Sequence, residues 1–269
     1  MDKIALNFGF SSCPNDTFAF HALVHGLVSG PKVEPFIDDI EALNERACRG
    51  EAEVTKISAA VFSCLHDRYA LLRAGAVAGF GVGPIVVARS ARPVGGRIAI
   101  PGERTTAALL LRLLGRFETV AMRFDEIGKA VLDGRADCGV FIHEGRFTYA
   151  RRGLTLLADL GAVWETRMGC PLPLAAIAIR RDLAPHVALN LEAAIRESVS
   201  YARQNPEASR AYVASHAQEV EPDVVARHIG LYVNDYTLQV DEASFRKFLQ
   251  WGRAEEVFAD MPEDRPIFI

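Results

Sequence analysis

The chain has 269 residues, 50% of them hydrophobic and 24% charged, which suits a globular protein with a substantial core. Its formal net charge is -4 and it has no block of basic residues, so it lacks the electrostatic surface that nucleic-acid binding requires. The N-terminus shows no signal-peptide pattern and no run approaches the ~18 apolar residues of a membrane span, so we expect a cytoplasmic protein without a membrane partner.

The first third of the chain alternates strand-like and helix-like segments. Apolar and polar side chains alternate before Ser11, as in a half-buried strand, and Asn15 or Asp16 is then placed to cap a helix. A second helix is predicted to end at Gly50, because glycine favours helix C-termini. The predicted elements are a strand over 3–10, helices over 17–28 and 41–49, a strand over 53–58 and a helix over 59–72.

The second third repeats this order. A strand leads through a glycine-containing loop to Thr105 and Thr106, which are placed to cap a helix, and a later helix ends at Gly134. The predicted elements are a strand over 96–101, helices over 107–114 and 125–133, and a strand over 136–142. The repeat predicts two similar α/β lobes with parallel strands, whose ligands bind at the carboxyl ends of the strands.

Two extended apolar runs, 79–90 and 171–181, separate these segments from each other and from a C-terminal region that is mostly helical. We interpret both runs as crossover strands of a hinge. The C-terminal helices are predicted over 186–203, 207–216, 222–232 and 241–258. The predicted fold is therefore α/β and type 2 periplasmic-binding-protein-like, with two α/β lobes joined by two crossover strands and the ligand cleft between them. Residues 1–84 and 181–269 form the predicted first lobe, and residues 85–180 the second.

His143 directly follows the predicted strand over 136–142. An imidazole there suits a general base, because it titrates near neutrality, although a structural histidine bonded to a backbone carbonyl fits the position equally well. On an extended chain Glu144 and Arg146 would share the opposite face, where they pair with each other or support the loop. Whether either of them contacts a substrate stays open at this point.

Several positions are candidates for holding an anion. Lys56 lies in an apolar strand at the position that corresponds to His143 in the repeat, so it is either an anion ligand or an edge residue with its ammonium in water. Ser58 could donate a hydroxyl to the same ligand or cap the next helix. The helix starts at Pro14–Thr17 and at Thr105–Thr106 offer unpaired N–H groups suited to a carboxylate, and plain capping is the alternative.

The cysteines give no sign of a disulfide framework or a zinc site. The five of them are scattered, and no C-x-x-C spacing occurs, so most are expected to be small core residues. They are Cys13, Cys48, Cys64, Cys138 and Cys170.

Taken in order, the blocks "SSCPNDTFAFHALVHG", "GVGPIVVAR", "PGERTTAALLL", "FDEI" and "GVFIHEGRFTY" resemble the 1,4-dihydroxy-6-naphthoate synthase family. The resemblance runs from about residue 4 to 183, and the CPNDTF and IHE-RFTY blocks together are its most specific part. It departs from the family at Ala175, where the family usually has glycine, and this affects the expected details of hinge closure.

The resemblance implies an enzyme of menaquinone biosynthesis by the futalosine pathway, without metal or cofactor. The implied reaction converts cyclic dehypoxanthinylfutalosine to 1,4-dihydroxy-6-naphthoate and releases dihydroxyacetone. His143 would be the general base. The implied substrate-binding residues are Lys56, Ile57, Ser58, Thr106 and Ala107, to which we add Asn15 at the first helix start.

Three other functions compete with this reading. Chorismate dehydratase of the same pathway shares the fold, although the CPNDTF and IHE-RFTY blocks favour the naphthoate enzyme. A cytoplasmic protein that binds a small carboxylate without chemistry would need no base at a strand end. An exported solute-binding protein would carry a signal sequence. For the enzyme we expect a small-molecule carboxylate as the partner, and a monomer or a weak homodimer.

Overall fold

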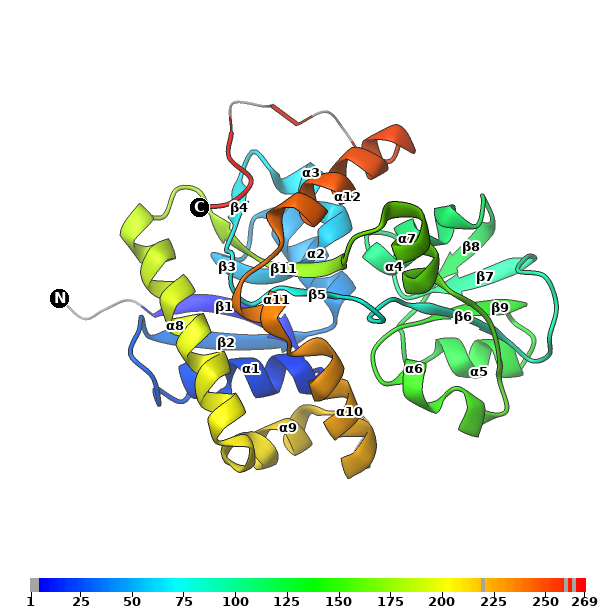
Figure 1. Ribbon diagram of the computed structural model, residues 1–269, viewed down its shortest axis with the longest axis horizontal. Coiled ribbons are helices and arrows are strands. Elements are labelled where there is room, and N and C mark those ends of the chain that lie inside the picture. The colour runs from blue at the N-terminus through cyan, green and yellow to red at the C-terminus, as the bar shows by residue number, and fades with distance from the viewer. Residues whose placement is uncertain (1–4, 219–220, 259–260, 263–264) are drawn as a thin grey trace.

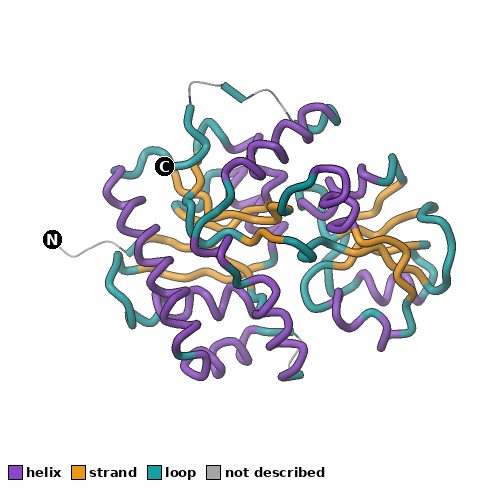
Figure 2. The backbone as a smooth tube through the Cα atoms, viewed as in Figure 1, coloured by secondary structure: helices purple, strands orange, loops and turns teal. Residues whose placement is uncertain are grey.

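The computed structural model describes residues 5–218, 221–258, 261–262 and 265–269, which form two lobes side by side (Figure 1). Each lobe is built on its own β-sheet, and the two sheets stand apart in the tube view (Figure 2). The predicted two-lobe α/β architecture is confirmed.

The first sheet has the strand order β2-β1-β3-β11-β4, and β5 also pairs with β11. Strand β1 is parallel to β2 and β3, as the alternation of strands and helices predicts, whereas β11 runs antiparallel to β3, β4 and β5. The strands are β1 (Leu6–Ser11), β2 (Val33–Asp38), β3 (Val54–Ser58), β4 (Tyr69–Leu71), β5 (Val77–Gly79) and β11 (Leu172–Arg180).

The second sheet has the order β10-β6-β9-β7-β8. Strand β7 is parallel to β8 and β9, and β6 is antiparallel to both β9 and β10. In both sheets, therefore, a strand that arrives from the other lobe, β11 or β6, runs against its neighbours. The strands are β6 (Ile85–Ala88), β7 (Arg97–Ile100), β8 (Glu118–Ala121), β9 (Cys138–Phe141) and β10 (Thr155–Asp159).

Helices cover both sheets. Around the second sheet lie α4 (Thr106–Leu110), α5 (Ile127–Leu132), α6 (Gly145–Thr148) and α7 (Leu160–Met168), with 3₁₀ turns over Leu111–Leu113 and Ala150–Arg152. With the first sheet lie α1 (Pro14–Val24), α2 (Ile40–Arg49), α3 (Phe62–Leu65), α8 (Pro185–Gln204), α9 (Arg210–His216), α10 (Pro222–Tyr232), α11 (Asp235–Leu238) and α12 (Glu242–Ala254), with 3₁₀ turns over Ala59–Val61 and Pro206–Ser209.

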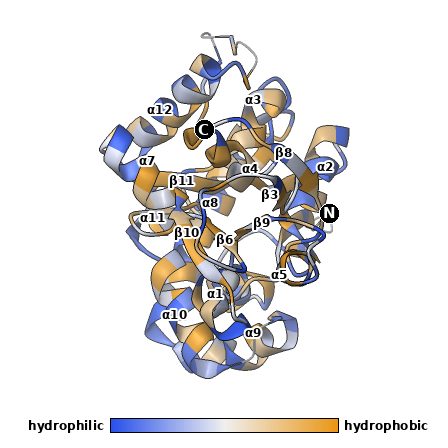
Figure 3. Cartoon of the chain, turned by 90° about the vertical axis from the view of Figure 1, so that its right-hand side faces the viewer, coloured by the Kyte–Doolittle hydropathy of each residue, from blue (hydrophilic) through white to orange (hydrophobic). Residues whose placement is uncertain are grey.

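The C-terminal helices pack against elements of the first lobe. Helix α8 packs on α1, and next to that contact the rings of Phe8, Phe10 and Phe20 meet at centroid separations of 5.1 to 5.3 Å. Both α10 and α12 carry polar and apolar stretches around their circumference (Figure 3), as expected for helices with one face in the core. None of the described helices is long and apolar enough to cross a membrane.

Strand pairing divides the chain differently from the predicted boundary at residue 180. Strand β11 belongs to the first sheet along its whole length, so the return crossing precedes Leu172. The two crossings touch at Gly83 and Gly161, because a Cβ atom on Gly83 would lie 2.2 Å from the Cα of Gly161. Glycine is therefore required where the two backbones meet.

Arg146 holds this crossing region together. Its guanidinium donates to the carbonyl of Gly83 at 2.5 Å and to the carboxylate of Asp159 at 2.6 Å. The prediction of an extended chain over this segment is wrong, because helix α6 begins at Gly145 and turns Arg146 toward β10. Arg146 thus supports the loop beside the hinge, one of the two roles expected for it.

The start of α1 differs from the prediction. The helix begins at Pro14, three residues early, with Cys13 as an N-cap that makes no side-chain capping bond. Proline is favoured at the first helical position because its fixed φ suits the helix. The carboxylate of Asp16, a predicted cap, is engaged elsewhere. The helix ends at Val24 rather than Val28, since Gly26 adopts a left-handed φ of 66°.

Other predictions failed where burial does not leave a periodic pattern. Residues 59–72 are a 3₁₀ turn, the short helix α3 and strand β4 instead of one helix. The edge strands β2 and β8 were missed because most of their side chains are at least partly exposed, and Pro35 further disguises β2. Strand β10 and helix α7 were missed as well.

Candidate functional site

A cavity of about 600 Å³, including its opening to solvent, lies between the two lobes. It is bounded by the carboxyl ends of β1 and β3, by the segments that follow β7 and β9, by the first crossing, by β5 and β11, and by α10. This is the place where open α/β sheets bind ligands. The lining residues are Ser11, Asn15, Ile40, Lys56, Ser58, Val77, Val82, Pro84, Thr105, Thr106, Ala107, Ile142, His143, Leu174, Ala175, His228 and Tyr232.

Strand β3 presents Lys56 and Ser58 to the cavity because side chains two residues apart point to the same face. Ile57 points the other way, is fully buried and packs in the hydrophobic core. Its side chain therefore lies outside the cavity wall. A substrate contact of Ile57 would have to involve its backbone.

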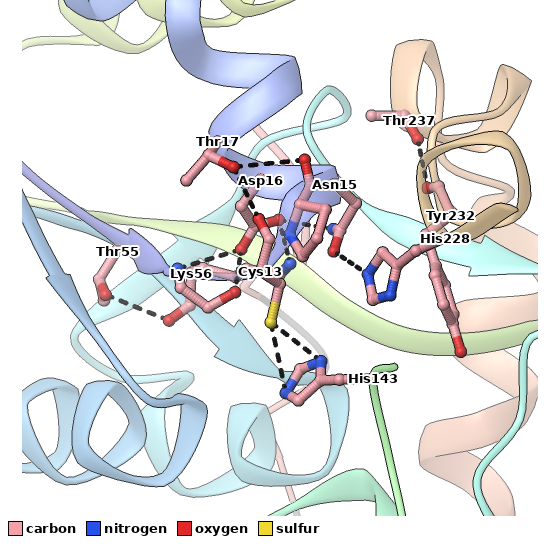
Figure 4. Close-up of polar contacts among 12 residues, drawn as sticks. Cys13, Asn15, Asp16, Thr17, Thr55, Lys56, His143, His228, Tyr232 and Thr237 are labelled. Atoms are coloured by element: carbon pink, nitrogen blue, oxygen red, sulfur yellow. Dashed lines mark hydrogen bonds and ion pairs between the residues drawn. The ribbon is translucent and has the colours of Figure 1, made fainter. Parts of the chain in front are cut away.

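Lys56 is held by a carboxylate that sequence reasoning had taken for a helix cap. The ammonium of Lys56 forms an ion pair with Asp16, and both side chains are almost completely buried (Figure 4). Asp16 also accepts from the backbone N–H of Ser11 at 3.0 Å and from its hydroxyl at 2.6 Å. The pair is neutral as a whole, so this wall of the cavity has less net positive charge than Lys56 alone would supply.

Asn15 links this ion pair to helix α10. Its amide nitrogen donates to Asp16 at 2.7 Å, and its amide oxygen lies 2.8 Å from Nε2 of His228. His228 is fully buried within the lobe structure and lines the cavity. The Asn15 side chain thus bridges two protein groups, and it also lines the cavity.

His143 reaches the cavity from the opposite lobe, two residues beyond the end of β9. Its backbone adopts a left-handed φ of 53°, an uncommon conformation that aims the ring across the cleft. The Sγ of Cys13, in the first lobe, lies 3.0 Å from Nδ1 and 3.5 Å from Nε2 of this ring (Figure 4). Phe124 packs edge-on against the ring of His143, at 4.9 Å between centroids.

Burial determines the protonation of both partners in this contact. Burial, together with the charge of Lys56, lowers the pKa of His143 to about 3, so its imidazole is neutral at physiological pH. Burial, followed by the negative charges of Glu144 and Asp16, raises the pKa of the Cys13 thiol well above its usual value. The thiol therefore keeps its proton and can donate it to a nitrogen of His143.

These shifts predict acid sensitivity of the fold. His143 binds a proton in the unfolded chain below about pH 6.5 but in the folded protein only near pH 3, so stability should fall as pH decreases through this window. One such group contributes at most about 1.4 kcal/mol per pH unit. Urea titrations from pH 7.5 to 4 should give a shallower decline in the free energy of unfolding for His143→Asn than for the unmodified protein. Identical slopes would contradict the burial of a neutral His143.

Thr106 and Ala107 line the cavity at the start of α4. Thr105, and not Thr106, caps this helix, by accepting from the N–H of Ala108 at 3.1 Å. The hydroxyl of Thr106 donates to the carbonyl of Leu174 at 2.7 Å, so it ties the second lobe to β11. A contact of Thr106 with a ligand would therefore use its backbone N–H or its remaining acceptor capacity.

Ser58 retains a donor for a ligand. Its oxygen accepts from the amide of Asn44 at 3.1 Å, and its own N–H donates to the amide oxygen of Asn44 at 2.8 Å. Because the oxygen already accepts, the hydroxyl hydrogen is left to point into the cavity. Ser58 does not cap the following turn with its side chain.

The structure thus brings Asn15, Lys56, Ser58, Thr106, Ala107 and His143 to one cavity, although their roles stay predictions. Sequence reasoning missed Cys13, His228 and Tyr232, and assigned Asp16 only to capping. For Cys13, its position beside the CPNDTF helix start was a usable signal. His228 gave none, since a lone histidine in a C-terminal helix has no local pattern. No group of three or more His, Cys, Asp or Glu side chains within the described ranges could hold a metal ion.

The chain matches a family model over most of its length. The model is described as menaquinone biosynthesis and covers residues 6–254. A 1,4-dihydroxy-6-naphthoate synthase from Thermus thermophilus is 45% identical over 270 residues, spanning 98% of this chain and 99% of the relative. The enzyme of the same name from Streptomyces coelicolor is 44% identical over 281 residues, spanning the whole of both chains.

Solved structures share the same fold. Protein AF1704 from Archaeoglobus fulgidus has a TM-score of 0.91 and 39% identity, over 96% of this chain and all of that one. The alkanesulfonate-binding protein SsuA from Xanthomonas axonopodis pv. citri, bound to MOPS, has a TM-score of 0.74 at 14% identity, over 98% of each chain. The second likeness confirms the predicted periplasmic-binding-protein-like fold and, at this identity, nothing beyond the fold.

Proposed function

The chain belongs to the menaquinone biosynthesis family, and on that premise we propose that it is the lyase that converts cyclic dehypoxanthinylfutalosine to 1,4-dihydroxy-6-naphthoate and releases dihydroxyacetone. The observation that carries the proposal is a neutral imidazole, His143, facing a cavity whose opposite wall holds hydrogen-bond donors. The two relatives named 1,4-dihydroxy-6-naphthoate synthase align with this chain over nearly its whole length.

In this proposal His143 is the general base. It takes a proton next to the ring carbonyl of the substrate, and the electron pair of that C–H bond forms a ring double bond while a carbon–carbon bond breaks. The three-carbon fragment leaves with the electron pair of the broken bond and takes up a proton, which gives dihydroxyacetone, as the second ring becomes aromatic. A base with a pKa of about 3 is weak. The carboxylate of the substrate adds negative charge to the cavity, and this raises the pKa of a nearby imidazole.

The opposite wall supplies the contacts that place the substrate. The Ser58 hydroxyl and the N–H groups of Lys56 that Asp16 does not use are donors for the carboxylate. The start of α4, at Thr106 and Ala107, offers backbone N–H groups for the same purpose. Closure of the two lobes around the substrate would orient it next to His143 and exclude water.

The decisive experiment offers the purified protein two substrates separately. With cyclic dehypoxanthinylfutalosine we expect a naphthalene product, detected by its ultraviolet absorbance, together with an equal amount of dihydroxyacetone. With chorismate we expect no change. Dehydration of chorismate would identify the protein as a chorismate dehydratase. Tight binding of the futalosine derivative without any product would identify a carboxylate-binding protein instead.

The proposal includes a setting for this reaction. A soluble, cytoplasmic enzyme suits a small-molecule carboxylate substrate, with neither nucleic acid nor membrane as a partner. In this proposal the residues of the site all come from one chain, so activity requires no more than a monomer or a weak homodimer. Analytical ultracentrifugation over a range of concentrations measures this directly, and a stable higher oligomer would contradict it.

A further inference from the structure

His228 in helix α10 is a polar residue of the cavity that the proposed reaction does not use. The side chain is fully buried, and the ring packs against Tyr232 with a centroid separation of 4.7 Å. The ring lies 6.4 Å from the ring of His143, between centroids, and is tilted from it by 28°. His228 therefore lies on the cavity wall close to the proposed base (Figure 4).

The hydrogen bonds around His228 fix which of its nitrogens carries a proton. Asp16 is an ionised carboxylate paired with Lys56, so it only accepts, and the amide group that faces it must be the NH₂ of Asn15. The amide oxygen of Asn15 then faces His228. Because this oxygen also only accepts, Nε2 of His228 must be the donor.

Nδ1 of His228 is consequently the acceptor of a neutral ring. Burial, with smaller contributions from His143 and Lys56, lowers the pKa of His228 well below its usual value, so the ring stays neutral. Nδ1 is buried and has no hydrogen-bond partner in the described part of the chain. A buried acceptor without a partner is costly, by about 1–3 kcal/mol, unless a ligand supplies a donor.

We propose that Nδ1 of His228 accepts a hydrogen bond from a substrate hydroxyl next to the carbon–carbon bond that breaks. This rests on the proposed function, whose three-carbon product carries two hydroxyl groups. A carboxylate has no proton to donate to this nitrogen, so the carboxylate end belongs at the Lys56 and Ser58 wall. The hydroxylated end then lies between His228 and His143, where the proton is removed.

A series of polar contacts thus connects the two ends of the proposed substrate site, from Lys56 through Asp16 and Asn15 to His228. The ion pair orients the Asn15 amide, and the amide sets the tautomer of His228. In this proposal Asn15 acts as a positioning residue for His228. This gives the predicted Asn15 a role through another residue, in place of direct contact with the substrate.

Nitrogen-15 NMR of the histidine side chains tests the proposal directly. The His143→Asn variant should turn the substrate over about 10²–10⁴-fold more slowly, so the substrate itself can serve as the probe. In the free protein, Nδ1 of His228 should show the shift of an unprotonated nitrogen, and Nε2 should keep a coupled proton. Saturation with substrate should move the Nδ1 signal upfield, as acceptance of a hydrogen bond does, without protonating it. A merely structural histidine would leave this signal in place.

Two substitutions separate the two nitrogens of His228. In His228→Asn the amide oxygen can occupy the position of Nδ1 and accept from the substrate. In His228→Gln the amide NH₂ can occupy the position of Nε2, which keeps the bond to Asn15 and loses the acceptor. We expect His228→Gln to raise KM about tenfold or more over the unmodified protein, and His228→Asn to raise it less.

The outcomes distinguish failure of this inference from failure of the proposed function. If the unmodified protein forms the naphthalene product while the Nδ1 signal stays unmoved on substrate saturation, the proposed function stands and the role of His228 is wrong. An equal or larger rise in KM for His228→Asn than for His228→Gln, with both variants folded by circular dichroism, also contradicts it. Absence of turnover in the unmodified protein overturns both together.

Discussion

Replacing His143 by asparagine should lower turnover by about 10²–10⁴-fold, the contribution that a general base typically makes. Asparagine tolerates the left-handed backbone that this position requires, so the loop should keep its shape. It has no nitrogen that accepts a proton near neutral pH. The measurement is single-turnover formation of the naphthalene product, together with calorimetric titration of substrate binding.

The control for this variant is His186→Asn, which changes an exposed histidine at the start of α8. Its turnover should equal that of the unmodified protein. Substrate should bind His143→Asn with an affinity close to that of the unmodified protein, because the proposed carboxylate contacts of Lys56 and Ser58 are unchanged. Near-normal turnover by His143→Asn would refute the role of His143 as the base.

Removing the carboxylate of Asp16 should destabilise the fold by about 3–5 kcal/mol, the usual cost of leaving one member of a buried ion pair without its partner. In Asp16→Ala the ammonium of Lys56 stays buried, and Ser11 and Asn15 lose their acceptor as well. The measurement is the free energy of unfolding from urea titration at pH 7.5, with the m-value checked for two-state behaviour.

A double variant separates charge from packing. In Asp16→Ala with Lys56→Met both charges are absent and the apolar stem of residue 56 is retained, so much of the lost stability should return. Substrate affinity should not return, because the ammonium is gone. The exposed pair of Arg123 and Asp125 serves as the control, and Asp125→Ala should change the free energy of unfolding far less. A cost for Asp16→Ala as small as this control would show that the buried pair is unimportant for stability.

Local patterns were sufficient to locate much of the site. Lys56 and Ser58 alternate on one face of β3, and His143 follows an apolar strand of the second lobe. Both conclusions depend only on the period of a strand and on where it ends. Within each sheet the carboxyl ends of the parallel strands meet at one edge, which places these positions where ligands bind. How the two lobes pack decides that the two edges face one cavity.

The sequence was less informative wherever a side chain could either cap a helix or contact a distant residue. Asp16 in the first turn of a helix is a common cap by composition, yet here its partner is Lys56, 40 residues away. Thr106 has the composition of a helix cap, but Thr105 caps the helix and Thr106 bonds to β11. In both cases the local sequence predicted a capping bond to the backbone of the same helix, whereas in the fold the side chain bonds to a distant residue.

From the amino-acid order alone, one can obtain the two lobes, the strands that end at the cleft, the proposed base and the family, because all of these are recorded in periods, spacings and short motifs. The contact of Cys13 with His143, 130 residues apart, and that of Asn15 with His228, 213 residues apart, depend on how two lobes and a returning C-terminal helix close around one cavity. No local sequence pattern predicts such contacts, because the residues on either side of a position in the sequence do not depend on which distant residue the fold brings into contact with it.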